Sequence, residues 1–126
     1  MELIVGGAFQ GKLEYAKELF PDRDWADGED CSLEDLKRAG GVWRFQSLIR
    51  RLLQQGALPD DLAERVFQEN PELIVISDEV GSGVVPADAF EREFREKTGR
   101  ICTELARRSR RVHRVVCGIG KVIKDA

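Results

Sequence analysis

The opening of the chain is the feature that most constrains its fold: an apolar run, a glycine-rich segment and a helical pattern follow one another. Residues 3–5 form the apolar run, and residues 6–12 (GGAFQGK) have the Gly-x-x-x-x-Gly-Lys spacing of a phosphate-binding loop. Residues 12–20 then carry apolar side chains at helical spacing before Pro21. Strand, glycine loop and helix in this order predict a loop that can hold phosphate at a helix N-terminus.

In such a loop, backbone N–H groups surround the phosphate oxygens and a lysine neutralises their charge. Lys12 is the candidate lysine, and Leu13 stands where the motif has a Ser or Thr that helps to coordinate Mg²⁺. The alternative is a tight turn that needs glycine, with Lys12 a solvated residue of the first helical turn. The candidate phosphate-binding residues are Gly6, Gly7, Ala8, Phe9, Gln10, Gly11, Lys12 and Leu13.

A second candidate site follows the apolar run at residues 73–76, in the segment 77–86 (SDEVGSGVVP). If that run and residues 3–5 are neighbouring parallel strands, Asp78 and Glu79 lie beside the glycine loop, where open parallel sheets bind ligands. The two carboxylates are candidates to hold a hydrated Mg²⁺ or to take a proton from an attacking hydroxyl. Gly81 and Gly83 are candidate ligand-side residues, since glycine lets the backbone pass close to a ligand. A polar strand-to-loop transition is the alternative.

The remaining pattern alternates strands and helices, which predicts an α/β fold with a mostly parallel sheet flanked by helices. We expect one domain over residues 1–126. The expected elements are a short strand around Trp25, helices beginning after Ser32 and over residues 42–55 and 62–69, a long amphipathic helix after Pro86, and a final strand at 112–116 with a glycine-containing exit at 117–120.

Composition narrows the class of partner. The net charge of −3 and a sequence pI near 5.3 argue against a nucleic-acid binder, and the basic run 106–114 is expected to be the solvated end of the long helix. No apolar run approaches the ~20 residues of a membrane helix, and no signal-peptide pattern precedes the first strand, so a cytoplasmic protein is expected. Three widely spaced cysteines and the single His113 do not suggest a disulfide framework or a histidine-rich metal site. The cysteines are expected to act as small hydrophobes.

The segment 77–100 (SDEVGSGVVPADAFEREFREKTGR), together with the N-terminal glycine-lysine loop and the closing VVCGIG, resembles the bifunctional adenosylcobinamide kinase/adenosylcobinamide-phosphate guanylyltransferases. The resemblance implies a P-loop NTPase-like fold, ATP or GTP with Mg²⁺ as cofactors, and a corrinoid acceptor in cobalamin biosynthesis. It also implies Lys12, Asp78 and Glu79 as catalytic residues. Arg95 and Arg100 are implied to support the charge being transferred.

The resemblance to the family is limited in two respects. Residues 21–70 do not align with the family, and complete members accept the guanylyl group on a histidine between the first helix and the central strands. Because the only histidine here is His113, near the C-terminus, guanylyltransferase activity is not expected. The leading hypothesis is a small nucleotide-binding kinase. Its rivals are a non-catalytic nucleotide-binding or regulatory protein and a protein whose main role is homo-oligomeric assembly.

Overall fold

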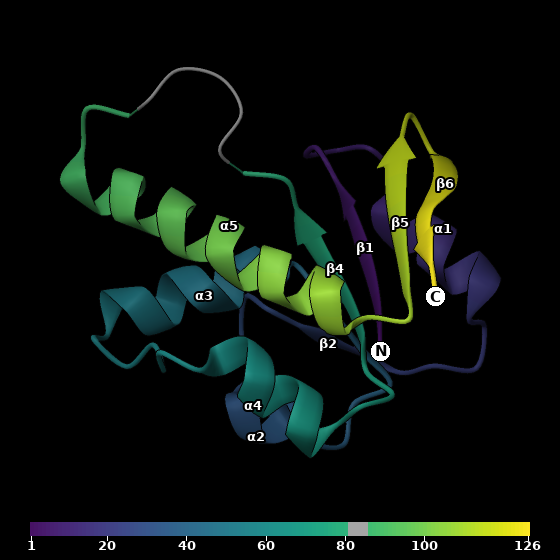
Figure 1. Ribbon diagram of the computed structural model, residues 1–126, viewed down its shortest axis with the longest axis horizontal. Helices are drawn as coiled ribbons and strands as arrows, with labels where there is room; N and C mark the ends of the chain where they lie inside the picture. The colour runs from purple at the N-terminus through teal and green to yellow at the C-terminus, as the bar shows by residue number, and fades with distance from the viewer. Residues whose placement is uncertain (81–85) are drawn as a thin grey trace.

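The computed structural model describes residues 1–80 and 86–126. They form a sheet of six strands in the order β2-β3-β4-β1-β5-β6, in which all neighbours are parallel except β5 and β6 (Figure 1). This confirms the expected α/β fold of the P-loop NTPase type, with a mostly parallel sheet flanked by helices.

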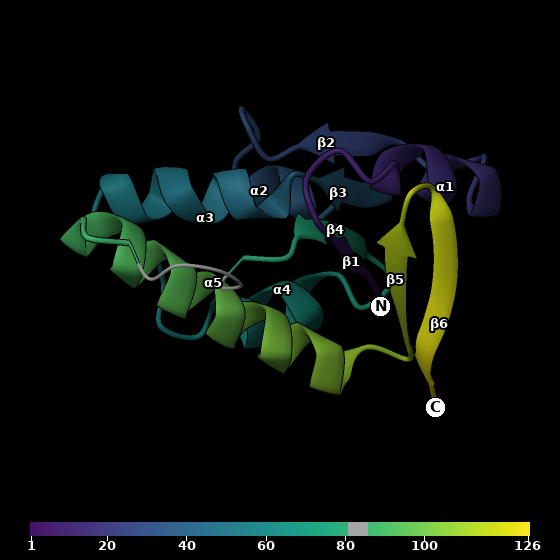
Figure 2. The same cartoon turned by 90° about the horizontal axis from the view of Figure 1, so that it is seen from above.

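The strands are β1 (Glu2–Gly6), β2 (Trp25–Asp27), β3 (Gly41–Trp43), β4 (Ile74–Asp78), β5 (Arg111–Val116) and β6 (Ile119–Asp125). The helices are α1 (Lys12–Leu19), α2 (Leu33–Leu36), α3 (Phe45–Gln54), α4 (Leu62–Glu69) and α5 (Ala89–Arg108). Figure 2 shows α3, α4 and α5 on one side of the sheet and α1 on the other. The sheet is thus covered on both faces, as parallel sheets require.

Alternating side chains of the central strands supply two cores. Leu3 and Val75 belong to the larger core under α3, α4 and α5, whereas Ile4, Ile74 and Ile76 belong to the smaller one, which also contains Ala16 of α1. The period of two along each strand places one set on each face. Continuous apolar runs in β1 and β4 are therefore explained by burial from both sides.

Local signals fix several helix ends. Ser32 caps α2 in a capping box with Asp35, and Asp88 caps α5 by accepting a hydrogen bond from the Glu91 N–H at 3.0 Å. The helix expected over residues 62–69 has those bounds in the structure. The short strand expected around Trp25 is also present, as β2.

Three expectations about the chain's organisation were wrong. Residues 42–55 do not form one helix, because Gly41–Trp43 pair with β2 and β4 and α3 starts only at Phe45. The exit at 117–120 consists of a hairpin turn at residues 117–118 and the start of β6 at Ile119. The basic run 106–114 is only partly helical, since α5 ends at Arg108 and Arg111 and Arg114 lie on β5.

The cysteines differ from one another in exposure. Cys31 is buried and Cys102 half-buried, as expected of small hydrophobes, and burial raises the pKa of both thiols. Cys117 is exposed in the hairpin turn, which corrects the expectation for that residue. Among the residues that the structure describes, none of the helices is both long and apolar enough to cross a membrane.

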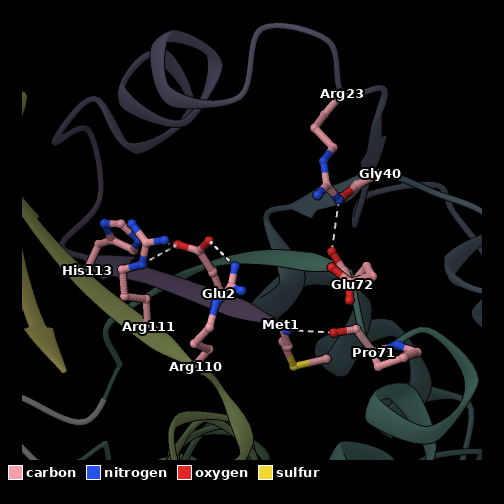
Figure 3. A network of polar contacts seen from close by, with 9 residues as sticks. All are labelled: Met1, Glu2, Arg23, Gly40, Pro71, Glu72, Arg110, Arg111 and His113. Atoms are coloured by element: carbon pink, nitrogen blue, oxygen red, sulfur yellow. Dashed lines mark hydrogen bonds and ion pairs between the residues drawn. The ribbon is translucent and has the colours of Figure 1, made fainter. Parts of the chain in front are cut away.

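The edge of the sheet opposite the glycine loop is held by a buried polar network (Figure 3). The Glu2 carboxylate lies 2.7 Å from Nε2 of His113 and 3.5 Å from Nη2 of Arg110, and Nε of Arg111 lies 3.7 Å away. On the other ring nitrogen, the Tyr15 hydroxyl is 2.8 Å from Nδ1 of His113. Glu2 and His113 are both buried, so these contacts tie β1, β5 and α1 together.

Candidate functional site

The glycine loop lies between β1 and α1, as the sequence predicts. β1 ends at Gly6, which pairs with Asp78 at the end of β4, and α1 begins at Lys12. Gly11 caps the helix with a φ of 80°, in the left-handed region that glycine enters without a steric penalty. It has no side chain to bind the first N–H groups of α1, which leaves the positive end of the helix facing the loop.

Lys12 does not extend into solvent. Its Nζ donates a hydrogen bond to the Gly7 carbonyl oxygen at 2.7 Å and forms an ion pair with Oδ1 of Asp78, also at 2.7 Å. Only 8% of the Lys12 side chain is exposed, against 29% for Asp78. The ammonium is thus fixed between the loop and the carboxyl end of the adjacent strand.

The tip of the loop is attached to the β5–β6 turn. Oε1 of Gln10 accepts a hydrogen bond from the Cys117 N–H at 2.6 Å, and the Gln10 carbonyl accepts one from the Gly118 N–H at 2.7 Å. Phe9, at the tip, is fully exposed with a φ of 61°. These contacts set the position of the loop from its far side.

Left-handed backbone gathers around this loop. Within the described ranges, the non-glycine residues with positive φ are Phe9, Cys117 and Arg44, the last with a φ of 52° at the N-cap of α3. Phe9 lies in the loop, Cys117 binds it, and Arg44 faces it across a pocket. Such conformations cost of order 1–3 kcal/mol each and cluster at functional sites.

The pocket has a volume of about 490 Å³ and lies along the carboxyl edge of the sheet. One side is formed by the loop and the first turn of α1, and Asp78 and Ile76 of β4 lie at its floor. The opposite side, which we call the far wall, consists of Glu29, Trp43, Arg44, Gln46 and Ser47. The pocket therefore spans from the end of β1 to the end of β2, three positions away in the sheet.

Arg44 organises the far wall. Its guanidinium donates two hydrogen bonds to the Asp27 carboxylate, one of them from Nε at 3.0 Å, and lies 4.2 Å from the centre of the Trp43 ring. The hydrogen bonds from Arg44 hold the pKa of Asp27 below its usual value. Gln46 links the wall to the floor, because its Oε1 accepts a hydrogen bond from the Asp78 N–H at 3.0 Å.

Asp27→Asn should destabilise the protein in a pH-dependent way. A folded-state pKa below the unfolded one stabilises the fold above the unfolded pKa, and this contribution is lost as pH falls through the folded pKa. Because the pair is partly exposed, we expect a loss of about 1 kcal/mol at pH 7 that shrinks below about pH 4. Urea unfolding at several pH values measures it, with Asp30→Asn as the control. A difference that stays constant from pH 7 to pH 3 would contradict it.

The other sequence-predicted residues are placed as follows. Leu13 lines the pocket and packs against the smaller core. Glu79 is directed to β5, where its Oε1 lies 3.2 Å from Nε of Arg114. Arg100 pairs with Glu96 on α5 and lines a different cavity, between α5 and the segment before α4, so the structure does not bring it to the loop. Arg95 is half-buried on α5. Gly81 and Gly83 lie outside the described residues.

Sequence reasoning missed the far wall. Glu29 and Arg44 follow strands of three residues each, which are too short to show a period of two. Trp43, also on the far wall, packs on the smaller core, and its ring centre lies 4.2 Å from the Arg44 guanidinium.

With the geometry described, comparison with known proteins gives the family. A model described as cobinamide kinase / cobinamide phosphate guanyltransferase matches residues 45–123, well over half of the chain. The chain belongs to this family. The matched range includes Asp78, Glu79 and the whole of α3 and β4, and it begins after the glycine loop. It also covers residues 45–70, so the expectation that all of residues 21–70 fail to align with the family was wrong for that part.

Two curated relatives are consistent with the assignment to the cobinamide kinase / cobinamide phosphate guanyltransferase family. Both are described as bifunctional adenosylcobalamin biosynthesis protein CobU, one from Escherichia coli (strain K12) and one from Salmonella typhimurium (strain LT2). Each is 40% identical over 53 residues, which is 42% of this chain and 29% of the relative. The match thus spans less than a third of the length of these relatives.

Proposed function

We propose that this protein is a nucleotide-binding kinase that transfers a phosphoryl group from ATP or GTP to an alcohol group of a cobinamide-type acceptor. The observation that carries the proposal is the position of Lys12, held at the start of α1 between the glycine loop and Asp78, on the wall of a pocket. A buried ammonium at a helix N-terminus, beside a carboxylate on the neighbouring strand, is an arrangement suited to polyphosphate.

In this proposal the phosphates of the nucleotide lie over the N-terminus of α1. The N–H groups of the loop and of the first helical turn bind the phosphate oxygens, and the Lys12 ammonium moves from Asp78 to the β- and γ-phosphates. The Asp78 carboxylate then faces the same pocket without Lys12 as its partner. The negative charge of the phosphates replaces that of Asp78 as the partner of Lys12.

The side chains at the loop supply only part of the ligand set that Mg²⁺ needs. Asp78 would hold the ion through a carboxylate oxygen, and the ion would neutralise charge on the phosphates. Leu13 offers no oxygen, so the remaining ligands would be water and the nucleotide. Glu79, the other metal ligand suggested by the sequence, is directed to Arg114 in this structure.

The proposal covers phosphoryl transfer and not guanylyl transfer. His113, the only histidine, is buried on β5 between Glu2 and Tyr15, opposite Ile4 in the middle of β1. A histidine that accepts a guanylyl group must present a ring nitrogen to the nucleotide. Both ring nitrogens of His113 already have partners within the fold.

The test is a transfer assay on the purified chain with ATP or GTP, Mg²⁺ and adenosylcobinamide, with formation of the phosphorylated corrinoid followed by chromatography. We expect product with at least one of the two nucleotides. Asp78→Asn, which removes the carboxylate beside Lys12, should reduce the rate strongly. Absence of product with both nucleotides, from a chain that binds them, would favour the second candidate.

The second candidate is a non-catalytic nucleotide-binding protein of the same fold. The specific observation in its favour is Leu13, which packs into the smaller core where a phosphate-binding loop usually supplies a metal-binding hydroxyl. This candidate predicts nucleotide binding that does not depend on Mg²⁺ and no transfer to the corrinoid.

A further inference from the structure

The turn after β2 is held in place by contacts that have no part in the function proposed above. Residues 27–31 leave the sheet at the end of β2 and are anchored by several hydrogen bonds. Arg51 of α3 donates from Nη1 to the carbonyls of Gly28 and Cys31, each at 2.8 Å, and the Gly28 N–H donates to the Trp43 carbonyl at 2.9 Å. The turn is thereby fixed to both β3 and α3.

Gly28 makes this close packing feasible. A Cβ at this position would lie 1.9 Å from the Arg44 carbonyl oxygen, so the turn could not approach β3 with any other residue there. Arg44 in turn takes its left-handed conformation next to this contact. Two unusual backbone features therefore set the place of the residue that follows, Glu29.

The Glu29 side chain faces the pocket from its far wall. Ser47 donates a hydrogen bond to Oε1 of Glu29 at 3.3 Å, and Nη1 of Arg44 lies 3.7 Å from the same oxygen. More than half of the side chain, 54%, is exposed, and it lines the pocket with the glycine loop opposite. β1 and β2 are three strand spacings apart, or about 14 Å. That span leaves room for an acceptor between the phosphates and Glu29.

The other carboxylates near the loop are less well placed to act on an acceptor. In the proposed nucleotide complex Asp78 would hold Mg²⁺ and not an acceptor proton, and Glu79 is paired with Arg114 outside the pocket lining. Glu14 lines the pocket from the first turn of α1, the turn that would hold the phosphates. In phosphoryl transfer the attacking and leaving oxygens lie roughly in line on opposite sides of the phosphorus. An acceptor oxygen therefore approaches from the far wall.

Resting on the proposed phosphoryl transfer, we propose that Glu29 is the general base for the acceptor, a primary or secondary alcohol bound against the far wall. The acceptor oxygen forms a bond to the γ-phosphorus while the bond from that phosphorus to the β–γ bridging oxygen breaks. The bond's electron pair leaves with the nucleoside diphosphate. The hydroxyl proton passes to the Glu29 carboxylate and then to water. Ser47 and Arg44 orient the carboxylate by its other oxygen.

Glu29→Gln tests this role. The amide keeps the size and the hydrogen bond from Ser47 but cannot accept a proton, so kcat for transfer from ATP or GTP to adenosylcobinamide should fall by about 100-fold or more. The KM for the nucleotide and the nucleotide-induced rise in Tm should be unchanged. Glu29→Asp should recover part of the lost rate.

The controls separate this inference from the proposed function. Glu18→Gln, an exposed change on α1 away from the pocket, should leave kcat unaltered. Full kcat in Glu29→Gln, or a loss confined to Glu14→Gln, would overturn the role of Glu29 while leaving the kinase in place. A fall in kcat matched by loss of the nucleotide-induced rise in Tm would show a structural role instead. A wild-type chain that transfers nothing would overturn both proposals.

Discussion

Lys12→Ala should abolish the stabilisation of this protein by nucleotide. A ligand that binds only the folded state at a hundredfold excess over its Kd stabilises it by about 2.7 kcal/mol. For a chain of this length, that corresponds to a rise in Tm of roughly 10 °C. We expect this rise in the wild type with Mg²⁺ and ATP or GTP. In the variant the phosphates lose the only ammonium on the pocket wall among the described residues, and the rise should vanish in differential scanning fluorimetry.

The baseline needs its own control, because Lys12 also pairs with Asp78 and its loss alters Tm without nucleotide. The quantity compared is therefore the nucleotide-induced shift and not Tm itself. Lys17→Ala removes an exposed lysine from the same helix and should keep the full shift. A shift of wild-type size in Lys12→Ala would show that the glycine loop is an idle turn.

Glu2→Ala should be the most destabilising single change to the polar contacts of this fold. Glu2 is 5% exposed and His113 1%, and the carboxylate is the shared partner of His113, Arg110 and Arg111. Removing the carboxylate leaves the buried Nε2 of His113 without its partner, which costs about 1–3 kcal/mol, whereas Arg110 and Arg111 are 61% and 38% exposed and can turn to water. The expected fall in Tm is roughly 4–12 °C. Thermal unfolding followed by circular dichroism measures it.

Tyr15→Phe provides a milder variant in case Glu2→Ala does not fold. Burial, and then the charge of Glu2, raises the pKa of Tyr15, which stays neutral and can donate to Nδ1 of His113 while Nε2–H donates to Glu2. Loss of that one hydroxyl should cost about 1 kcal/mol. Glu18→Ala, an exposed change on the same helix, should be close to neutral. Equal stability of Glu2→Ala and Glu18→Ala would refute the importance of the network.

The elements that were predicted correctly from the sequence are those in which one local sequence pattern outweighs any competing pattern. Local apolar patterns and helix- or strand-breaking residues predict three of these features. They are the apolar runs of β1 and β4, the glycine loop between β1 and α1, and the helix at residues 62–69. β3 was missed because Gly41 and two further residues carry too little pattern to compete with the helical spacing that follows Phe45. β6 was missed because its glycine and exposed side chains resemble a loop, and only pairing with β5 makes it a strand.

The candidate site likewise has one part that could be predicted from the sequence and one part that could not. The loop, Lys12 and Asp78 could be predicted because parallel strands end at one edge of the sheet, and the register of Gly6 with Asp78 has this result. Glu29 and Arg44 could not, because their place depends on a turn that is held by Arg51 and by the absence of a side chain at Gly28. Long-range contacts of this kind leave no periodic trace in the chain.

The fixed position of Lys12 also affects the thermodynamics of binding. Immobilising a lysine side chain costs up to about 1.5–2 kcal/mol of conformational entropy. In this protein that ordering takes place when the chain folds, because the ammonium is already held by Gly7 and Asp78. A ligand then exchanges one anionic partner for another at a group that is already in place. Binding is therefore opposed mainly by the enthalpy of the Asp78 pair, and less by the loss of side-chain freedom.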